Sequence, residues 1–95
     1  MNTPAKVLVI EDEKQIRRFV RVALEEEGCR VTEAETMTQG LLEAGSRKPD
    51  LLILDLGLPD GNGIDLIRDL RGWSDVPVLI LSARAQENDK IDALD

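Results

Sequence analysis

The sequence predicts an open α/β fold in which a parallel sheet carries helices on both faces. Three short apolar runs, at residues 7–10, 51–54 and 78–81, are separated by stretches with helical periodicity. Because strand and helix alternate along the chain, we expect parallel strands joined by right-handed crossovers. Each run also stops on an oxygen-bearing side chain, so the carboxyl ends of three strands are expected to meet at one site.

Composition limits the size of the core and the kinds of partner. The chain has 95 residues, 42% of them apolar, which suits one small domain over residues 1–95. Its net charge of −7 argues against direct binding to nucleic acid or to an anionic membrane. The absence of histidine excludes imidazole metal sites, and the lone Cys29 cannot form an internal disulfide. The sequence shows no targeting segment, so we expect a cytoplasmic protein.

The first half of the chain is expected to run strand, helix, strand, helix. After a strand over residues 5–10, an amphipathic helix presents an apolar stripe of Ile16, Phe19, Val20, Ala23 and Leu24. Gly28 is expected to end this helix in the left-handed conformation. A weak strand over residues 29–33 precedes a second helix, which a capping box of Thr36 and Gln39 opens. That helix is expected to end near Gly45 and to bury Met37, Leu41, Leu42 and Ala44.

The second half repeats this alternation around a segment rich in turn residues. After the strand over residues 51–54, residues 57–63 contain so many turn formers that we expect a loop. A helix over about residues 64–71, the strand over residues 78–81 and a last helix from about Gln86 follow. The helical pattern is still in register at Asp95, so we expect the chain to be a fragment that is incomplete at its C-terminus.

Carboxylates at the strand ends predict a divalent metal site. Glu11 and Asp12 follow the first strand and Asp55 follows the third, and such like charges repel unless a cation lies among them. Mg²⁺, or Mn²⁺, fits this set because hard cations take oxygen ligands. We expect Asp12 and Asp55 as direct ligands, Glu11 directly or through water, and one backbone carbonyl from the Gly57 loop. Asp55 can then act as a nucleophile towards a phosphoryl group, with Ser82 bonding a phosphoryl oxygen.

The same residues have ordinary structural alternatives. Asp12 could cap the first helix, Asp55 could accept backbone bonds at its strand end, and Ser82 could be a turn residue. Their common placement on three strands favours the functional interpretation. Trp73 is expected to be a packing residue at a loop rather than a binding hot spot.

These motifs resemble the receiver domain of bacterial two-component response regulators. The resemblance is carried by Glu11-Asp12, by the segment Asp55-Leu56-Gly57-Leu58-Pro59-Asp60-Gly61-Asn62-Gly63, and by Ser82-Ala83. It implies a flavodoxin-like three-layer sandwich with sheet order 2-1-3-4, here lacking the fifth strand and fifth helix. It also implies Asp55 as the phosphoacceptor, Glu11 and Asp12 as the acidic metal pair, Gly57 as the carbonyl ligand, and Ser82 as the hydroxyl that rearranges on phosphorylation.

Within this family the chain resembles OmpR-like regulators, and especially the Kdp-type, potassium-responsive ones. The resemblance implies a sensor histidine kinase as partner and, in the full-length protein, a DNA-binding transcriptional effector. It implies self-catalysed phosphorylation of the domain and no enzymatic turnover. The family's fifth strand, which ends in a lysine that pairs with the phosphoryl group, would lie after Asp95. Without that strand, we expect the strand over residues 78–81 to be an exposed edge available for self-association. The alternative function is a phosphorylation-silent interaction module that acts through its exposed surfaces.

Charged residues along the first helix have two interpretations. Glu25, Glu26 and Glu27, together with Arg17, Arg18 and Arg21, are expected to form a solvated helix surface. The resemblance gives equal weight to a recognition role for the arginines, because the first helix of receivers is where the kinase docks.

Overall fold

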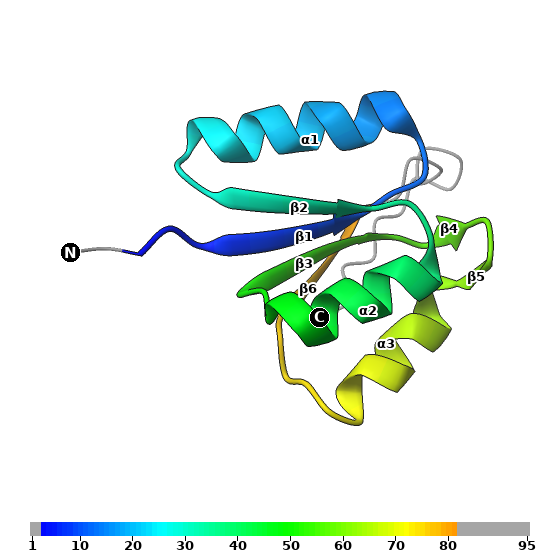
Figure 1. Ribbon diagram of the computed structural model, residues 1–95. Helices are drawn as coiled ribbons and strands as arrows, with labels where there is room; N and C mark the ends of the chain where they lie inside the picture. The colour runs from blue at the N-terminus through cyan, green and yellow to red at the C-terminus, as the bar shows by residue number, and fades with distance from the viewer. Residues whose placement is uncertain (1–2, 82–95) are drawn as a thin grey trace.

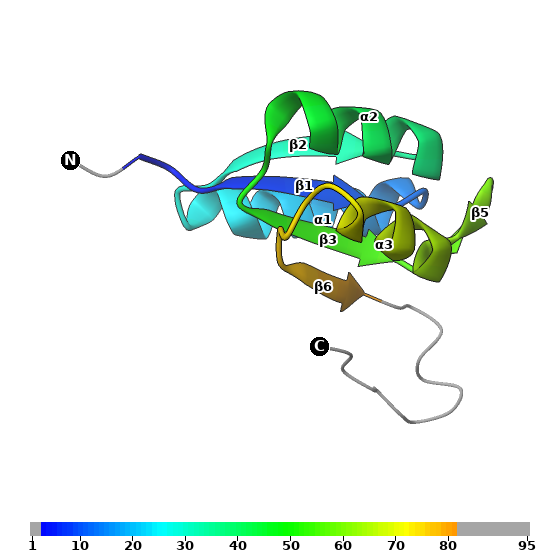
Figure 2. The same cartoon turned by 90° about the horizontal axis from the view of Figure 1, so that it is seen from below.

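A four-stranded parallel sheet forms the centre of the molecule. The computed structural model describes residues 3–81. The sheet has the order β2-β1-β3-β6, and its strands are β1 (Lys6–Ile10), β2 (Arg30–Ala34), β3 (Leu51–Asp55) and β6 (Val78–Leu81). All four strands run in the same direction, so their carboxyl ends lie at one end of the sheet (Figure 1, Figure 2). The predicted order 2-1-3-4 is confirmed, because β6 is the fourth strand of this sheet.

Helices cover both faces of the sheet, which gives the predicted three layers. Helix α1 (Lys14–Glu26) lies on one face, and α2 (Met37–Arg47) and α3 (Gly63–Arg71) lie on the other (Figure 1). Side chains of a strand alternate between the faces, so β1 serves two cores. Val7 and Val9 belong to the core on the α1 side, and Leu8 and Ile10 to the core beneath α2 and α3. Among the described residues, no helix is both long and apolar enough to cross a membrane.

The core beneath α2 and α3 depends on a close approach between α2 and β1. Gly40 makes this approach possible, because a Cβ atom at that position would overlap Ile10 Cδ1 and lie 3.0 Å from Ile10 Cγ1. Ile10 is completely buried and has little room to move. A small residue at position 40 therefore sets the distance between this helix and the sheet.

Most of the predictions made for the helix ends are confirmed. Gly28 follows α1 with a φ of +89°, as predicted. Thr36 Oγ1 accepts a bond from the Gln39 N–H (3.1 Å), but the Gln39 side chain accepts its bond from the N–H of Glu35, one residue before the cap (3.1 Å). Helix α2 runs beyond the predicted end near Gly45 and stops at Lys48, which takes a left-handed φ of +49° without being glycine.

Part of the predicted apolar pattern is wrong. Phe19 is 73% exposed and Leu42 is 67% exposed, and Ala23 is also exposed. Helix α1 packs on the sheet through Val20 and Leu24, which are four residues apart. Its contact face is thus narrower than the predicted stripe.

The segment after β3 contains a short hairpin, so the prediction of a loop is wrong for these residues. Strands β4 (Gly57–Leu58) and β5 (Gly61–Asn62) pair in antiparallel fashion, and Leu58 is buried in the core beneath α2 and α3. Asp60 at the hairpin tip accepts bonds from the N–H groups of Met37 (2.7 Å) and Thr38 (3.1 Å). The hairpin therefore supplies a cap to α2 from more than twenty residues away.

Candidate metal centre

Three carboxylates converge at the carboxyl ends of β1 and β3. Glu11, Asp12 and Asp55 each offer a carboxylate oxygen, and these oxygens lie within 4.8 Å of one another. The register explains the convergence: Ile10 pairs with Leu54, so the residues that follow them leave adjacent strands at the same height. The structure thus brings together the three acidic residues that the sequence singled out.

Burial makes the cluster electrostatically unfavourable on its own. Glu11 is 2% exposed and Asp55 is 6% exposed, whereas Asp12 is exposed. Burial raises the pKa of Glu11 to about 7, repulsion from Asp55 and Asp12 adds to this shift, and a hydrogen bond from the Glu13 N–H opposes it. At neutral pH the Glu11 carboxyl is therefore poised between its charged and neutral forms.

One oxygen of the cluster is left without a partner. Glu11 Oε2 accepts a bond from the Glu13 N–H (2.8 Å), but Glu11 Oε1 is buried and has no hydrogen-bond partner among the described residues. An unsatisfied buried oxygen beside two further carboxylates is the environment that a hard divalent cation satisfies. The donor set fits Mg²⁺ or Mn²⁺, and a chain without histidine offers little to a softer metal.

Two other predicted site residues can be compared with the structure. Gly57 lies beside the cluster, because its N–H donates to Asp55 Oδ1 (3.2 Å). The alternative role of Asp12 as a helix cap is wrong: Glu13 occupies the cap position, without a side-chain capping bond. Asp55 accepts one backbone bond, as its structural alternative required. Ser82 and the helix predicted from Gln86 lie outside the described residues.

Arg17 is buried beside the cluster, so the prediction of a solvated side chain is wrong for this residue. Its Nη1 donates to the backbone oxygen of Glu11 (3.0 Å), and its Nε donates to Glu33 Oε1 (3.0 Å). The neighbouring Arg21 is the solvated residue that was predicted, with about 45% of its side chain exposed. The sequence contains an indication of this burial: Arg17 precedes Val20 by three residues and Leu24 by seven, so it lies on the helix face that packs against the sheet.

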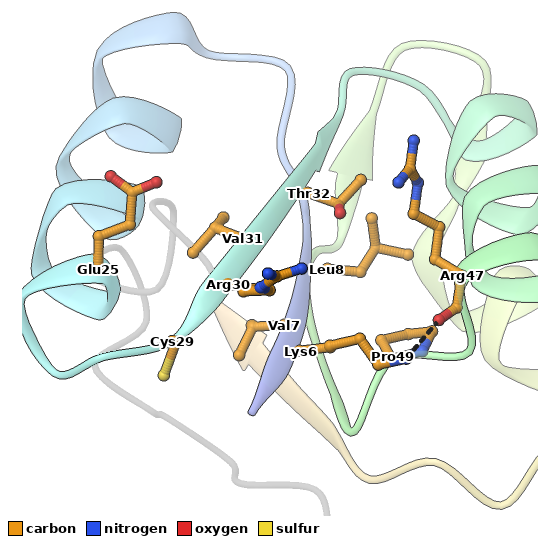
Figure 3. Close-up of a pocket in the computed structure, with 10 residues that line it drawn as sticks. All are labelled: Lys6, Val7, Leu8, Glu25, Cys29, Arg30, Val31, Thr32, Arg47 and Pro49. Atoms are coloured by element: carbon orange, nitrogen blue, oxygen red, sulfur yellow. Dashed lines mark hydrogen bonds between the residues drawn. The ribbon is translucent and has the colours of Figure 1, made fainter. Parts of the chain in front are cut away.

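A separate pocket lies at the opposite end of the sheet. It has a volume of about 370 Å³ and surrounds the amino ends of β1 and β2 (Figure 3). Cys29 and Arg30 line it, and Lys6 Nζ donates to the backbone oxygen of Arg47 (3.3 Å). None of the three clustered carboxylates lines this pocket, so it is distinct from the candidate metal centre.

Comparison with known proteins defines the class to which this fold and site belong. The family described as the response regulator receiver domain matches residues 7–95, and the chain belongs to this family. It is 70% identical over 89 residues to the KDP operon transcriptional regulatory protein KdpE of Escherichia coli (strain K12), covering 94% of this chain and 40% of that protein. It is 39% identical over 93 residues to the phosphate regulon transcriptional regulatory protein PhoB of the same strain, covering 95% and 41%. The resemblance to Kdp-type, OmpR-like regulators is confirmed, and the chain spans about 40% of the length of these curated relatives.

Solved structures of the same family confirm the flavodoxin-like class. The chemotaxis response regulator CheY4 of Vibrio cholerae superposes with a TM-score of 0.80 at 27% identity, covering 92% of this chain and 77% of that one. The non-phosphorylated HemR receiver domain from Leptospira biflexa superposes with a TM-score of 0.75 at 35% identity, covering 90% and 71%.

Proposed function

We propose that this chain is the phosphoacceptor module of a two-component signalling system and that Asp55 receives the phosphoryl group. One observation carries the proposal: a receiver-family chain holds three converging carboxylates, two of them buried, with a buried Glu11 oxygen left unsatisfied. Such a cluster costs stability unless it binds a cation. The cluster thus supports cation binding, and the membership of the chain in the receiver family supports phosphorylation over the phosphorylation-silent alternative.

Four residues would hold the metal. Asp12 and Asp55 would ligate it directly, Glu11 directly or through water, and Gly57 through its carbonyl. When bound, Mg²⁺ or Mn²⁺ neutralises the carboxylates and the charge that develops on the phosphoryl oxygens.

Asp55 supplies the nucleophile. One of its carboxylate oxygens forms a bond to phosphorus while the bond from phosphorus to the donor atom breaks, and the bonding electron pair leaves with the donor. The Gly57 N–H, which donates to Asp55 Oδ1, holds the carboxylate in one orientation, and the 6% exposure of Asp55 limits the access of water. Ser82 would then bond an oxygen of the transferred group.

The partner class follows from the family. Receiver domains accept phosphoryl groups from sensor histidine kinases, so we expect a phosphohistidine donor and a reaction in the cytoplasm. The module modifies itself and turns over no substrate. In a longer protein of the kind represented by KdpE, its phosphorylation would control a DNA-binding transcriptional effector.

Self-association through the fourth sheet strand stays a prediction. Within residues 3–81, β6 pairs with β3 alone, and Leu79 on β6 is 55% exposed. A strand edge of this type can recruit a strand from another molecule. Sedimentation at several concentrations tests it, and a monomer at every concentration would contradict it.

Phosphorylation of Asp55 is tested by intact-mass measurement. Acetyl phosphate with Mg²⁺ should add the mass of one phosphoryl group to the wild-type chain and nothing to Asp55→Asn, because an amide is a poor nucleophile. Asp65→Asn, a change at the first turn of α3, is the matched control and should be labelled like the wild type. Equal labelling of Asp55→Asn and the wild type would disprove the assignment.

A further inference from the structure

We infer that Arg17 is a positioning residue for the acidic site, whose guanidinium fixes the backbone turn from which Glu11 and Asp12 project. The inference rests on the proposed function, because it assigns Arg17 a role in metal binding and in the phosphorylation of Asp55. It concerns a side chain that contacts no phosphoryl group and ligates no metal.

The backbone of Glu11 is held on both sides. Its N–H donates to the backbone oxygen of Ala34 on β2 (3.0 Å), and its carbonyl oxygen accepts a bond from Arg17 Nη1 (3.0 Å). The first bond extends the pairing of β1 with β2 by one residue. The second bond gives the Glu11 carbonyl oxygen a side-chain donor at the point where the chain leaves the sheet and turns towards α1.

The guanidinium is itself fixed by two further residues. Arg17 Nε donates to Glu33 Oε1 (3.0 Å), and Nη2 lies 3.4 Å from Glu35 Oε2. The Arg17 side chain is 9% exposed, whereas the side chain of Glu33 is 26% exposed and that of Glu35 is 63% exposed, so the guanidinium is buried and its two carboxylate partners reach it from the surface. The planar guanidinium holds five N–H donors in a fixed fork that can bond a backbone oxygen and two carboxylates at once, whereas lysine carries its three donors on a single nitrogen at the end of a flexible chain.

The carbonyl that Arg17 holds belongs to the peptide group between Glu11 and Asp12. Asp12 is exposed, and its side chain makes no hydrogen bond to any residue between 3 and 81. Among the described residues, then, the placement of its carboxylate depends on the backbone at Asp12 and on the side chain's own torsions, with no hydrogen bond from another residue. If the peptide group is released, ψ of Glu11 and φ of Asp12 are freed, and a displacement of about 1 Å at a reactive site can cost about 100-fold in rate.

Arg21 provides a matched control on the same helix. It also binds Glu33, through Nη1 and Oε2 (2.7 Å), and its other ion pair is with Glu25 (3.0 Å). Arg17→Gln and Arg21→Gln each remove one positive charge and one ion pair to Glu33. In the described structure only the change at Arg17 also removes the bond to the Glu11 carbonyl.

The test is the affinity of the full chain for Mg²⁺, measured by calorimetry well below the unfolding temperature. Arg17→Gln should weaken binding about tenfold or more, as removal of a group that orients a ligand does, and should slow acetyl phosphate labelling most at low Mg²⁺. Arg21→Gln should bind Mg²⁺ within about twofold of the wild type. A simple charge effect has the opposite sign, because removing a nearby cation would strengthen the binding of another cation.

Two outcomes separate this inference from the proposed function. If the wild type binds Mg²⁺ and is labelled, but Arg17→Gln binds as tightly as Arg21→Gln, the positioning role is overturned and the proposed function stands. If the wild type neither binds Mg²⁺ nor is labelled, the proposed function fails and the positioning role fails with it. Should Arg17→Gln not fold, Arg17→Lys is compared with Arg21→Lys, because both variants keep the positive charge: weaker Mg²⁺ binding in Arg17→Lys than in Arg21→Lys supports the role, and equal binding overturns it.

Discussion

Glu11 is the residue at which stability and function conflict most directly. Burial, reinforced by the charges of Asp55 and Asp12, raises its pKa to about 7, above the value of about 4.3 for an unfolded chain. At pH values between these two pKa values, the Glu11 carboxyl is mostly protonated in the folded state and mostly ionised in the unfolded state. The free energy of unfolding in the absence of metal therefore falls as the pH rises from about 4.5 to about 7.

Replacing Glu11 with glutamine should stabilise the metal-free protein at pH 8 by about 1–3 kcal/mol, the usual cost of an unsatisfied buried group. The amide keeps an acceptor for the Glu13 N–H, carries no charge, and can donate towards Asp55. Urea unfolding with a metal chelator measures the effect. At pH 5 the gain in stability should nearly vanish, because Glu11 is then protonated in the folded wild-type protein. At pH 8 the Glu11→Gln variant should also bind Mg²⁺ less tightly than the wild type. An equal gain at both pH values would show that the pKa shift is not its cause.

Helix α2 is constrained in position at its first turn and at its middle. Asp60 bonds to its first turn from the hairpin, and Gly40 allows its middle to approach Ile10. Its last turns are less constrained, since a Cβ atom on Gly45 would lie 3.8 Å from Trp73, an ordinary van der Waals distance.

Two alanine substitutions on α2 should therefore have opposite effects. Gly40→Ala should destabilise the protein by about 1–3 kcal/mol, because the added methyl group overlaps the buried Ile10. Gly45→Ala should stabilise it by up to about 1 kcal/mol, because alanine favours a helix more than glycine and space is available. Thermal unfolding of the two variants measures both effects. A stabilising Gly40→Ala would show that α2 can move away from β1 at little cost.

Elements that depend on local signals could be predicted from the sequence, and contacts between distant residues could not. Gly28 and Thr36 act on their own helix ends, so their roles were predicted correctly. The convergence of the three acids was predicted because Glu11 and Asp12 come directly after β1 and Asp55 ends β3. The bonds of Asp60 were missed because its partners on α2 lie 22 and 23 residues away. The helix face of Arg17 indicated its burial, but its bond to the Glu11 carbonyl could not be predicted, because a backbone acceptor leaves no mark in the residue pattern.

At the scale of the whole molecule, the two central strands β1 and β3 hold the fold together. Each pairs with a strand on both sides, and the alternating side chains of each enter both cores. Removing any one helix would expose one core, but separating a central strand from the sheet would expose both. We therefore expect β1, the strand that leads into Glu11 and Asp12, to open only when the whole described structure does.

Amide hydrogen exchange should reveal this order. The amides of residues 7–10 should exchange only through global unfolding, with protection equal to the free energy of unfolding measured with denaturant. Amides of β6, which pairs with β3 alone within residues 3–81, should exchange through smaller openings and at least about tenfold faster. Equal protection of β1 and β6 would contradict this order.

The bond between Asp60 and α2 has a mechanical consequence for the site. Asp60 and Gly57 belong to one short hairpin, and a Cβ atom on Gly61 would lie 2.5 Å from Met37 Sδ, so hairpin and helix are in close contact. Gly57 cannot shift far unless the two N–H bonds of Asp60 break or the first turn of α2 moves with it. As long as these bonds hold, a displacement of the backbone next to Asp55 would therefore move the first turn of α2, a helix that supplies none of the three carboxylates.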